Sequence, residues 1–320
     1  MANTPTVKKI NTKFSLYSLI TVARPIHWVK NFSIFAALVF SGQLFWRARF
    51  IYVFWAFLAF NFITSATYIF NDLIDAKRDR LHPIKKNRPI ASGKIPISFA
   101  VIELIVLVAM SLKISYHLPY LFFILVIFYF VLQVAYSLFL KNLAVIDILI
   151  IASGFVIRVY AGAFAIDAHL SVWFLLCVIS TALFLASGKR RAELGVMGTS
   201  GQTRKSLAKY SPELLNSYVT MFGSASWIAW ALFTFFESPS SSTPLWIFLA
   251  EISKATTITK LLMITIPVTI FGIMRYEALI FEGRAEAPEK LLLKDVALVS
   301  SVIVWILMVV LILYGGIATG

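Results

Sequence analysis

The chain has 320 residues, of which 60% are hydrophobic and 14% are charged, and its formal net charge is +14. Soluble globular domains contain roughly 45–50% apolar residues, so this composition excludes an ordinary soluble domain and favours a membrane protein. The single cysteine, Cys177, excludes an intrachain disulfide framework and a cysteine-based metal site.

Apolar runs of about 17–25 residues are long enough to cross the hydrocarbon core as helices. The sequence predicts nine of them, so the expected fold class is all-α, a polytopic helical bundle in the membrane. The runs lie near residues 31–46, 50–70, 97–115, 119–140, 143–166, 171–187, 214–236, 258–280 and 295–317. The stretch ESPSSSTP at 237–244 is typical of a loop. Because no linker-like composition divides the spans, we expect one domain over residues 1–320.

Basic residues gather before the first span, between the second and third, and after the fourth, sixth and eighth. Lys and Arg favour the cytoplasmic side of a membrane, so we expect the N-terminus and these connections in the cytoplasm and the C-terminus outside. The expected location is the plasma membrane. The positive charge then has a topological cause, and we expect no nucleic-acid partner. The N-terminal segment lacks a signal-peptide cleavage site, so we expect it to belong to the mature protein.

The segment NDLIDAKRDRLHPIKKNRPIASG at 71–93 concentrates acids and bases between two apolar spans. If the second span continues as a helix beyond Phe70, then Asp72, Asp75 and Asp79 share one face, with Asn71 at its edge. Like charges at this spacing repel one another unless a cation is present. Oxygen ligands favour Mg²⁺, which commonly joins carboxylates to substrate phosphates. We therefore predict that these three aspartates bind Mg²⁺ and are catalytic; the alternative is a solvated loop with incidental ion pairs.

These motifs carry a resemblance to a known family. The acidic pattern followed by RPIASG at 88–93 resembles the UbiA prenyltransferase superfamily, whose members are nine-helix membrane enzymes that use Mg²⁺-bound diphosphate donors. RPIHWVKN at 24–31, DRLHPIKKNRPIASG at 79–93, YSLFLKNLAVIDI at 136–148, GKRRAEL at 188–194 and APEKLLLKD at 287–295 are similar to its branch that transfers phosphoribosyl groups to decaprenyl phosphate. The resemblance covers nearly the whole chain.

The resemblance also implies a set of substrate-binding residues. These are Lys30, Asn71, Lys85, Arg88, Tyr136, Lys141, Lys189, Arg190 and Glu193. Prenyl-diphosphate enzymes of the superfamily carry a second aspartate-rich motif after the sixth helix, whereas this chain has SGKRRAELG there. Cationic side chains suit the additional 5-phosphate of a phosphoribosyl diphosphate donor. Tyr136 and Lys141 are otherwise common interfacial anchors.

Arg158 lies in the middle of the fifth predicted span, within ASGFVIRVYAG. Ionisable residues at this depth usually face a bundle interior or a cavity, so we predict that Arg158 binds a substrate phosphate. The structural alternative is an ion pair with Asp147, about three helical turns away. We expect Asn61 and Glu103 to be interhelical hydrogen-bonding residues outside the site.

The expected function is transfer of 5-phosphoribose from phosphoribosyl diphosphate to a polyprenyl phosphate, with release of diphosphate. The expected partners are these two substrates and the lipid bilayer, and a homo-oligomer is a further possibility. One alternative is an aromatic prenyltransferase with a prenyl diphosphate donor. A membrane transporter is the other, but it would have polar residues through both halves of its spans, whereas here they crowd one face.

Overall fold

The structure, a computed structural model, describes residues 16–81, 85–197, 206–237, 258–282, 291 and 294–315. Every regular element in these ranges is helical, which confirms the predicted all-α class. The predicted loop at 237–244 lies almost entirely outside them. The elements are α1 (Leu16–Ala23), η1 (Pro25–Phe35), α2 (Ala36–Phe40), α3 (Arg47–Asp79), η2 (Lys85–Asn87), α4 (Ile97–Tyr116), α5 (Tyr120–Leu138), η3 (Leu140–Asn142), α6 (Ile146–Ile166), α7 (Val172–Met197), η4 (Leu207–Lys209), α8 (Pro212–Phe236), η5 (Ile258–Thr265), α10 (Ile266–Phe281) and α12 (Val296–Tyr314).

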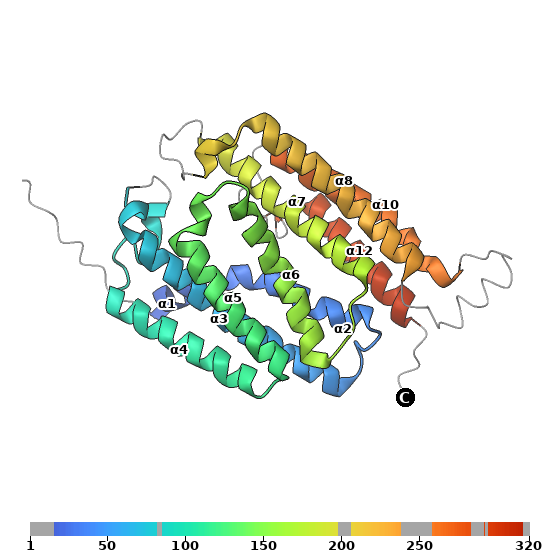
Figure 1. The fold of residues 1–320 in the computed structure, drawn as a ribbon, viewed down its shortest axis with the longest axis horizontal. Helices are drawn as coiled ribbons and strands as arrows, with labels where there is room; N and C mark the ends of the chain where they lie inside the picture. Colours follow the sequence, from blue (N-terminus) through green and yellow to red (C-terminus); the bar gives the residue numbers. More distant parts are fainter. Residues whose placement is uncertain are drawn as a thin grey trace, which may run out of the picture.

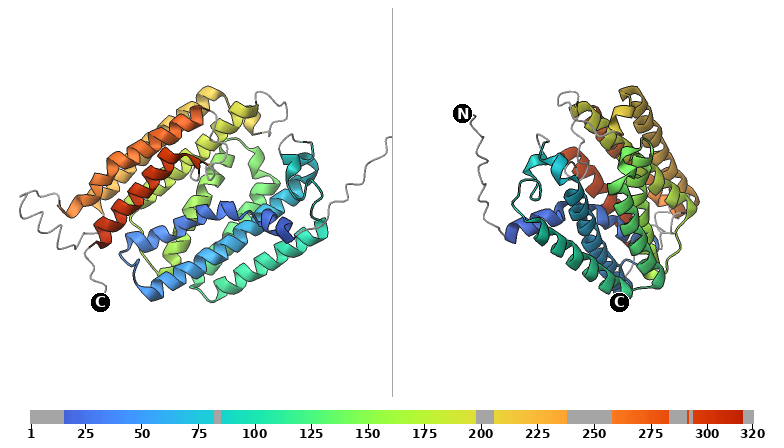
Figure 2. Two further views of the ribbon diagram at one scale, coloured as in Figure 1. Left: turned by 180° about the vertical axis from the view of Figure 1, so that it is seen from behind. Right: turned by 60° about the vertical axis from the view of Figure 1, so that its left-hand side comes forward.

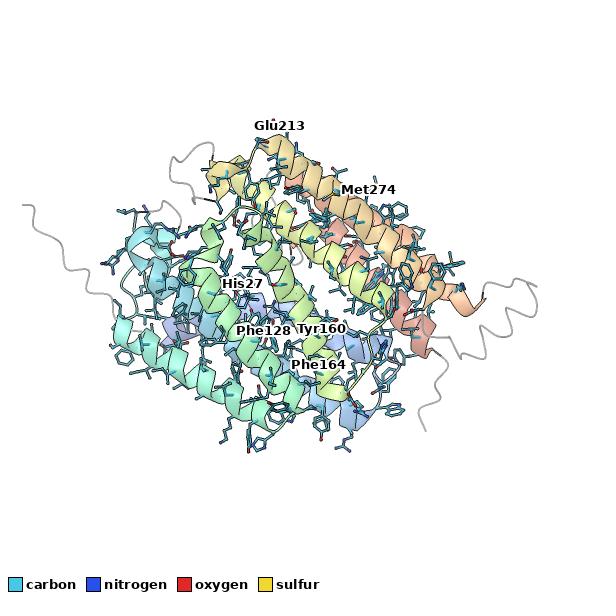
Figure 3. The ribbon with its side chains drawn as sticks, viewed as in Figure 1. His27, Phe128, Tyr160, Phe164, Glu213 and Met274 are labelled. Carbon is cyan, nitrogen blue, oxygen red and sulfur yellow. The ribbon has the colours of Figure 1, made fainter. Side chains whose placement is uncertain are left out.

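Eight helical spans in the described residues are long and apolar enough to cross a membrane. They are α3, α4, α5, α6, α7, α8, the joined η5 and α10, and α12, and they correspond to the last eight predicted spans. A helix satisfies its own backbone hydrogen bonds, which is why apolar runs adopt this form in lipid. Large apolar side chains such as Phe128 on α5 and Met274 on α10 are exposed on the outside of the bundle, where lipid would surround them (Figure 3).

The first predicted span differs from the expectation, because it begins at Pro25 and is wound mainly as a 3₁₀ helix before the short α2. Arg24, just before it, has φ 53° and ψ 59°, and Pro25 starts the helix. A 3₁₀ helix rises about 2.0 Å per residue and an α-helix about 1.5 Å, so Pro25–Phe40 extends about 30 Å, the thickness of the hydrocarbon core. Arg24 contacts the end of α3, while Tyr314 of α12 bonds Leu38 and Val39. This short segment is therefore long enough to make a ninth crossing.

The helices form two groups with α6 between them (Figures 1 and 2). One group contains α3, α4 and α5, and the other contains α7, α8, α10 and α12. A buried cluster that includes Ile34, Phe60 and Ile157 joins η1, α3 and α6. A second cluster, which includes Trp230 and Val309, unites the other group. The segment η1–α2 packs against α3 and α6, so it links these two helices.

Gly162 of α6 allows this close packing of η1. A Cβ atom at position 162 would overlap the backbone carbonyl of Ile34. The obstacle is main chain rather than a movable side chain, so a larger residue here would force the two elements apart. The approach of η1 to α6 therefore depends on one missing side chain.

Candidate active site

The three predicted aspartates lie on the last two turns of α3. This helix runs from Arg47 to Asp79, well beyond the predicted end of its apolar run at residue 70. Asp72, Asp75 and Asp79 are all buried, with 2%, 6% and 3% of their surfaces exposed. The predicted continuation of the helix, with the acids on one face, is therefore confirmed.

Two arginines from separate segments neutralise Asp72 and Asp79. Arg24 Nη2 donates to both carboxylate oxygens of Asp72, at 2.7 and 2.6 Å. Arg88 Nη1 bridges the two acids, at 3.0 Å from Asp72 and 2.6 Å from Asp79. Arg80 Nε donates to the carbonyl of Ala91 at 3.2 Å, which ties the segment carrying Arg88 back to α3. Arg24 was missed as a site residue, although it begins the RPIHWVKN motif that carried the family resemblance.

Asp75 has two cations of its own. Lys141 Nζ donates to Asp75 Oδ1 at 2.7 Å, and Arg78 donates to the same oxygen at 2.9 Å. Lys141 is buried, with 3% of its surface exposed, and comes from the connection between α5 and α6. We refer to Asp72, Asp75, Asp79, Arg24, Arg78, Arg88 and Lys141 as the charged cluster. Its three carboxylates and four cations leave a formal net charge of +1, which suits an anionic ligand.

That Asp72, Asp75 and Asp79 bind Mg²⁺ stays a prediction. Within the part of the chain that the structure describes, no three His, Cys, Asp or Glu side chains are arranged to hold a metal. The physical reason is that guanidinium and ammonium groups occupy oxygens of all three aspartates. The donor chemistry still fits Mg²⁺, which needs only one or two carboxylates when substrate phosphates complete its coordination. Binding would require these oxygens to exchange a protein cation for the metal.

The structure places Arg190 differently from the prediction. We expected it to contact the donor, but it is completely buried in α7. Its Nη1 donates to Glu193, its Nη2 donates to the Tyr136 hydroxyl at 2.9 Å, and its Nε lies 2.7 Å from Asp147 Oδ2. The Nε contact is ionic, since its N–H bond does not point at an acceptor. Arg190, Glu193 and Tyr136 are therefore brought together, but as a buried network beside the charged cluster.

Asp147, Ser206 and Tyr210 complete this second network and were missed as site residues. Tyr210 donates to Asp147 Oδ1 at 2.7 Å, and the Ser206 hydroxyl lies 3.2 Å from Oδ2. Burial raises the pKa of Tyr210, and its hydrogen bond to Asp147 raises it further, so the phenol stays protonated. An acid one residue into a strongly apolar span was the available signal, because a buried carboxylate requires a partner.

Arg158 does not join either network. Its Nε donates to Asn31 at 2.5 Å, its Nη1 to the Gly154 carbonyl at 2.5 Å, and its Nη2 to the Tyr129 hydroxyl at 3.0 Å. The alternative ion pair with Asp147 is also not formed, because Asp147 pairs with Arg190. Neutral acceptors and two aromatic rings surround the guanidinium at mid-depth.

A row of polar contacts connects Arg158 with the charged cluster along η1 and α3. Residues of η1 meet α3 in antiparallel order, through the pairs Arg24–Asp72, His27–Tyr68, Trp28–Ser65 and Asn31–Asn61. The partners on α3 are separated by four, three and four residues, so they form one helical stripe. Asn61 is thus an interhelical hydrogen-bonding residue, as predicted.

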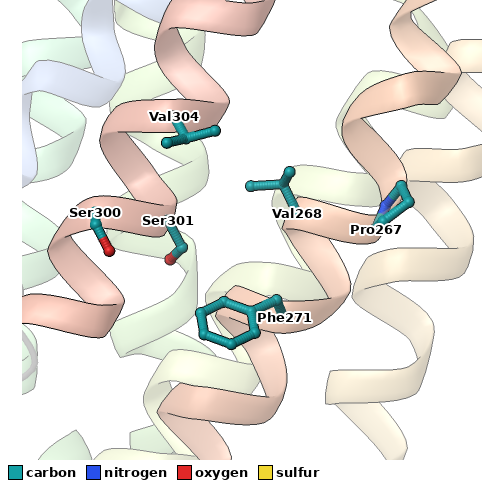
Figure 4. A pocket seen from close by; sticks show the side chains of 6 residues that line it. All are labelled: Pro267, Val268, Phe271, Ser300, Ser301 and Val304. Atoms are coloured by element: carbon teal, nitrogen blue, oxygen red, sulfur yellow. The ribbon is translucent and has the colours of Figure 1, made fainter.

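Three of the remaining predicted residues lie near the same end of the molecule, and Lys30 lies deeper, next to Asn31. Asn71 precedes Asp72 in α3, Lys85 is in η2, Lys189 precedes Arg190 in α7, and Lys30 is in η1. All four are partly exposed. Their roles remain predictions. A groove elsewhere, between α10 and α12, is lined by Pro267, Val268, Phe271, Ser300, Ser301 and Val304 and has no charged lining (Figure 4).

The comparisons place this helical bundle, with its charged cluster at one end of α3, among membrane transferases. The chain belongs to the UbiA prenyltransferase family, whose sequence profile matches residues 19–189. A decaprenyl-phosphate phosphoribosyltransferase from Corynebacterium glutamicum is 34% identical over 302 residues, which cover 92% of this chain and 86% of the relative. The enzyme of the same name from Mycolicibacterium smegmatis is 37% identical over 293 residues, covering 90% of each chain.

Solved structures agree on the fold. A UbiA homolog from Archaeoglobus fulgidus bound to DMAPP and Mg²⁺ has a TM-score of 0.63, 16% identity, and coverage of 95% of this chain and 100% of that one. A digeranylgeranylglyceryl phosphate synthase has a TM-score of 0.61 at 16% identity, with coverage of 94% and 99%. At this identity the likeness establishes the architecture alone.

Proposed function

We propose that the protein transfers a 5-phosphoribosyl group from phosphoribosyl diphosphate to a polyprenyl phosphate of the decaprenyl type, releasing diphosphate. The observation that carries this proposal is the charged cluster at the end of α3, in a chain at least a third identical to decaprenyl-phosphate phosphoribosyltransferases. Both substrates are phosphorylated, and a buried cluster with more cations than carboxylates suits them.

Asp72 and Asp75, with Asp79 beside them, would hold Mg²⁺. The bound ion would supply charge neutralisation to the departing diphosphate. Arg24, Arg88 and Lys141, which lie against these carboxylates, would donate to phosphate oxygens of the substrates. The same cations would therefore stabilise the free site and bind the donor.

The acceptor needs little activation, because a phosphate monoester is already anionic at neutral pH. Its oxygen attacks the anomeric carbon of ribose as the bond to the diphosphate breaks, with positive charge developing on the sugar ring. A single displacement inverts the anomeric configuration. The task left to the side chains is to hold two anions in line, which is positioning rather than proton transfer.

The partly exposed residues around the cluster have supporting roles in this proposal. Lys189 is assigned to the 5-phosphate of the donor, and Lys85 with Asn71 to the diphosphate end. Lys30 faces the acceptor side along η1. Tyr136, Glu193 and Arg190 act from the buried network, and Arg158 marks the inner end of the polar row. We also propose that the cluster faces the cytoplasm at the plasma membrane, where the lipid tail stays in the bilayer, and that the chain can form homo-oligomers.

The test is a product assay with purified protein in detergent. The protein is incubated with Mg²⁺, decaprenyl phosphate and phosphoribosyl diphosphate, and in parallel with a prenyl diphosphate and an aromatic acid. Mass spectrometry of the lipid fraction should detect phosphoribosylated lipid in the first reaction only. A prenylated aromatic product would instead assign the chain to the aromatic prenyltransferases. If the folded protein makes neither product, the proposal is overturned.

A further inference from the structure

The connection between α5 and α6 places Lys141 against Asp75, and two side chains from beyond α7 hold this connection. Tyr210 accepts a hydrogen bond from the backbone N–H of Val145 at 2.5 Å. The Ser206 hydroxyl lies 2.9 Å from the carbonyl oxygen of Lys141. The Tyr210 hydroxyl also donates to Asp147 Oδ1, and the Ser206 hydroxyl, which shares its one proton between two acceptors, lies 3.2 Å from Asp147 Oδ2. The Asp147 carboxylate therefore orients the two hydroxyls that bond the backbone carbonyl of Lys141 and the backbone N–H of Val145.

The backbone at this turn does not hold its shape by itself. Val145 has φ 67° and ψ −49°, a conformation that β-branched residues rarely adopt. Such strain persists only where the surroundings determine it, and it is concentrated at functional sites. Here the surroundings include Tyr210, which satisfies the N–H group of the strained residue.

Arg190 supplies the counter-charge that makes this arrangement possible. Asp147 and Arg190 are both fully buried, and their ionic contact of 2.7 Å compensates the carboxylate in the interior. A buried charge without a partner is strongly destabilising. Arg190, Ser206 and Tyr210 also lie outside residues 19–189, the part matched by the family profile.

We propose that Asp147, Ser206, Tyr210 and Arg190 form a positioning clamp that fixes the Lys141 ammonium beside Asp75. The clamp contacts neither substrate; it acts through Lys141, whose chain position decides where the ammonium meets the donor phosphates. The inference rests on the proposed function and deepens it, because it names the residues that set the geometry of one of its phosphate-binding cations. It also explains why Arg190 is turned away from the charged cluster.

The test uses Tyr210→Phe, which keeps the ring but loses both hydrogen bonds, in the full-length protein. Tyr218→Phe is the matched control, since Tyr218 packs against the same apolar cluster. Hydrogen exchange followed by mass spectrometry should be faster in peptides covering 140–147 in the Tyr210 variant and unchanged in the control. The kcat for phosphoribosyl transfer should fall about tenfold, which corresponds to about 1.4 kcal/mol.

A double-mutant cycle separates positioning from general damage. In a Lys141→Met background, Tyr210→Phe should cause no further loss of kcat, because the group that it positions is gone. The clamp would be overturned if the losses of kcat from the two substitutions multiplied in the double variant. It would also be overturned if hydrogen exchange at 140–147 were unchanged in Tyr210→Phe. If Tyr210→Phe does not fold, Ser206→Ala tests the other half of the clamp by the same measurements. An inactive wild type would count against the proposed function, and the exchange experiment would still decide for or against the clamp.

Discussion

Asp75 is the residue of the charged cluster whose substitution tests the site most directly, because one of its oxygens accepts from both Lys141 and Arg78. Asp75→Asn removes a charged metal ligand at the centre of the acidic face. We expect turnover to fall by about 100-fold or more, because losing a group that only orients a metal ligand already costs about 10–100-fold. Activity across a Mg²⁺ titration in detergent is the measurement. Near-wild-type activity at low Mg²⁺ would remove Asp75 from the site.

A stability measurement separates this effect from misfolding. Asp75→Asn leaves the buried Lys141 ammonium beside a neutral amide, so the melting temperature should also fall. Adding Lys141→Met removes the buried charge that Asp75 neutralised and should recover much of the melting temperature without recovering turnover. Recovery of both would indicate that the pair only stabilises the fold.

Lys189 and Arg190 are neighbours in sequence, but the structure predicts opposite phenotypes. Arg190→Ala removes the cation that pairs with the fully buried Asp147, and breaking a buried pair of this kind costs about 3–5 kcal/mol. Thermal unfolding in detergent should therefore show a large loss of stability. Lys189→Ala, at a partly exposed position, should lower the unfolding temperature much less and raise the KM for phosphoribosyl diphosphate.

The donor contact of Lys189 has its own control. With a donor analogue that lacks the 5-phosphate, the penalty of Lys189→Ala should shrink. An equal penalty with both donors would place Lys189 on the diphosphate or in the structural frame instead.

These residues also mark how far the site was predictable. The spacing of Asp72, Asp75 and Asp79 determines a shared helical face, so their alignment followed from the sequence. Their partners did not, because Arg24, Arg88 and Lys141 approach from segments whose positions depend on the tertiary fold. Likewise, consecutive residues on a helix point about 100° apart, and no local pattern reveals that Arg190 rather than Lys189 meets Asp147.

At the scale of elements, the contact between η1 and α6 is the most sensitive to a single methyl group. Gly162→Ala would push a Cβ atom into the backbone of Ile34, which has little room to move between α3 and α6. We expect a loss of stability of about 1–3 kcal/mol, typical of overpacking. Thermal unfolding in detergent would measure it. Gly195→Ala is the control, because its Cβ would meet only Arg191 at an ordinary distance of 3.6 Å; equal melting temperatures for the two variants would contradict this account.

Helix α3 and segment η1–α2 show which elements a sequence specifies well. The acidic repeat past Phe70 kept helical spacing, so the extension of α3 was visible in advance. For the first predicted span, the apolar content indicated that a span exists but not that it is mainly a 3₁₀ helix. The 3₁₀ form and its start at Pro25 follow from contacts with α3 and α6, such as Trp28 with Ser65, which lie far away in sequence.

For the whole molecule, the basic connections predict that the charged cluster faces the cytoplasm. Asn87→Cys in a Cys177→Ser background places a single thiol on exposed η2, at the cluster's end of the bundle. An impermeant thiol reagent should label it only after cell lysis. Tyr120→Cys, in the same background and at the opposite end of α4 and α5, should react in intact cells. The reverse pattern would invert the proposed topology.

The length of α3 has a consequence for the membrane in which the protein works. Its 33 residues extend about 50 Å, against about 30 Å of hydrocarbon and about 40–45 Å including the headgroups. With the start of α3 at one surface of the membrane, we expect the aspartates on its last two turns at the level of the lipid phosphates of the other surface, where an acceptor lipid would react at its resting depth. Longer acyl chains would draw the carboxylates into hydrocarbon or force α3 to tilt. The rate of phosphoribosyl transfer in vesicles should accordingly pass through a maximum as the acyl chains of the lipid become longer. A rate that does not depend on bilayer thickness would contradict the proposal that the length of α3 sets the depth of the aspartates.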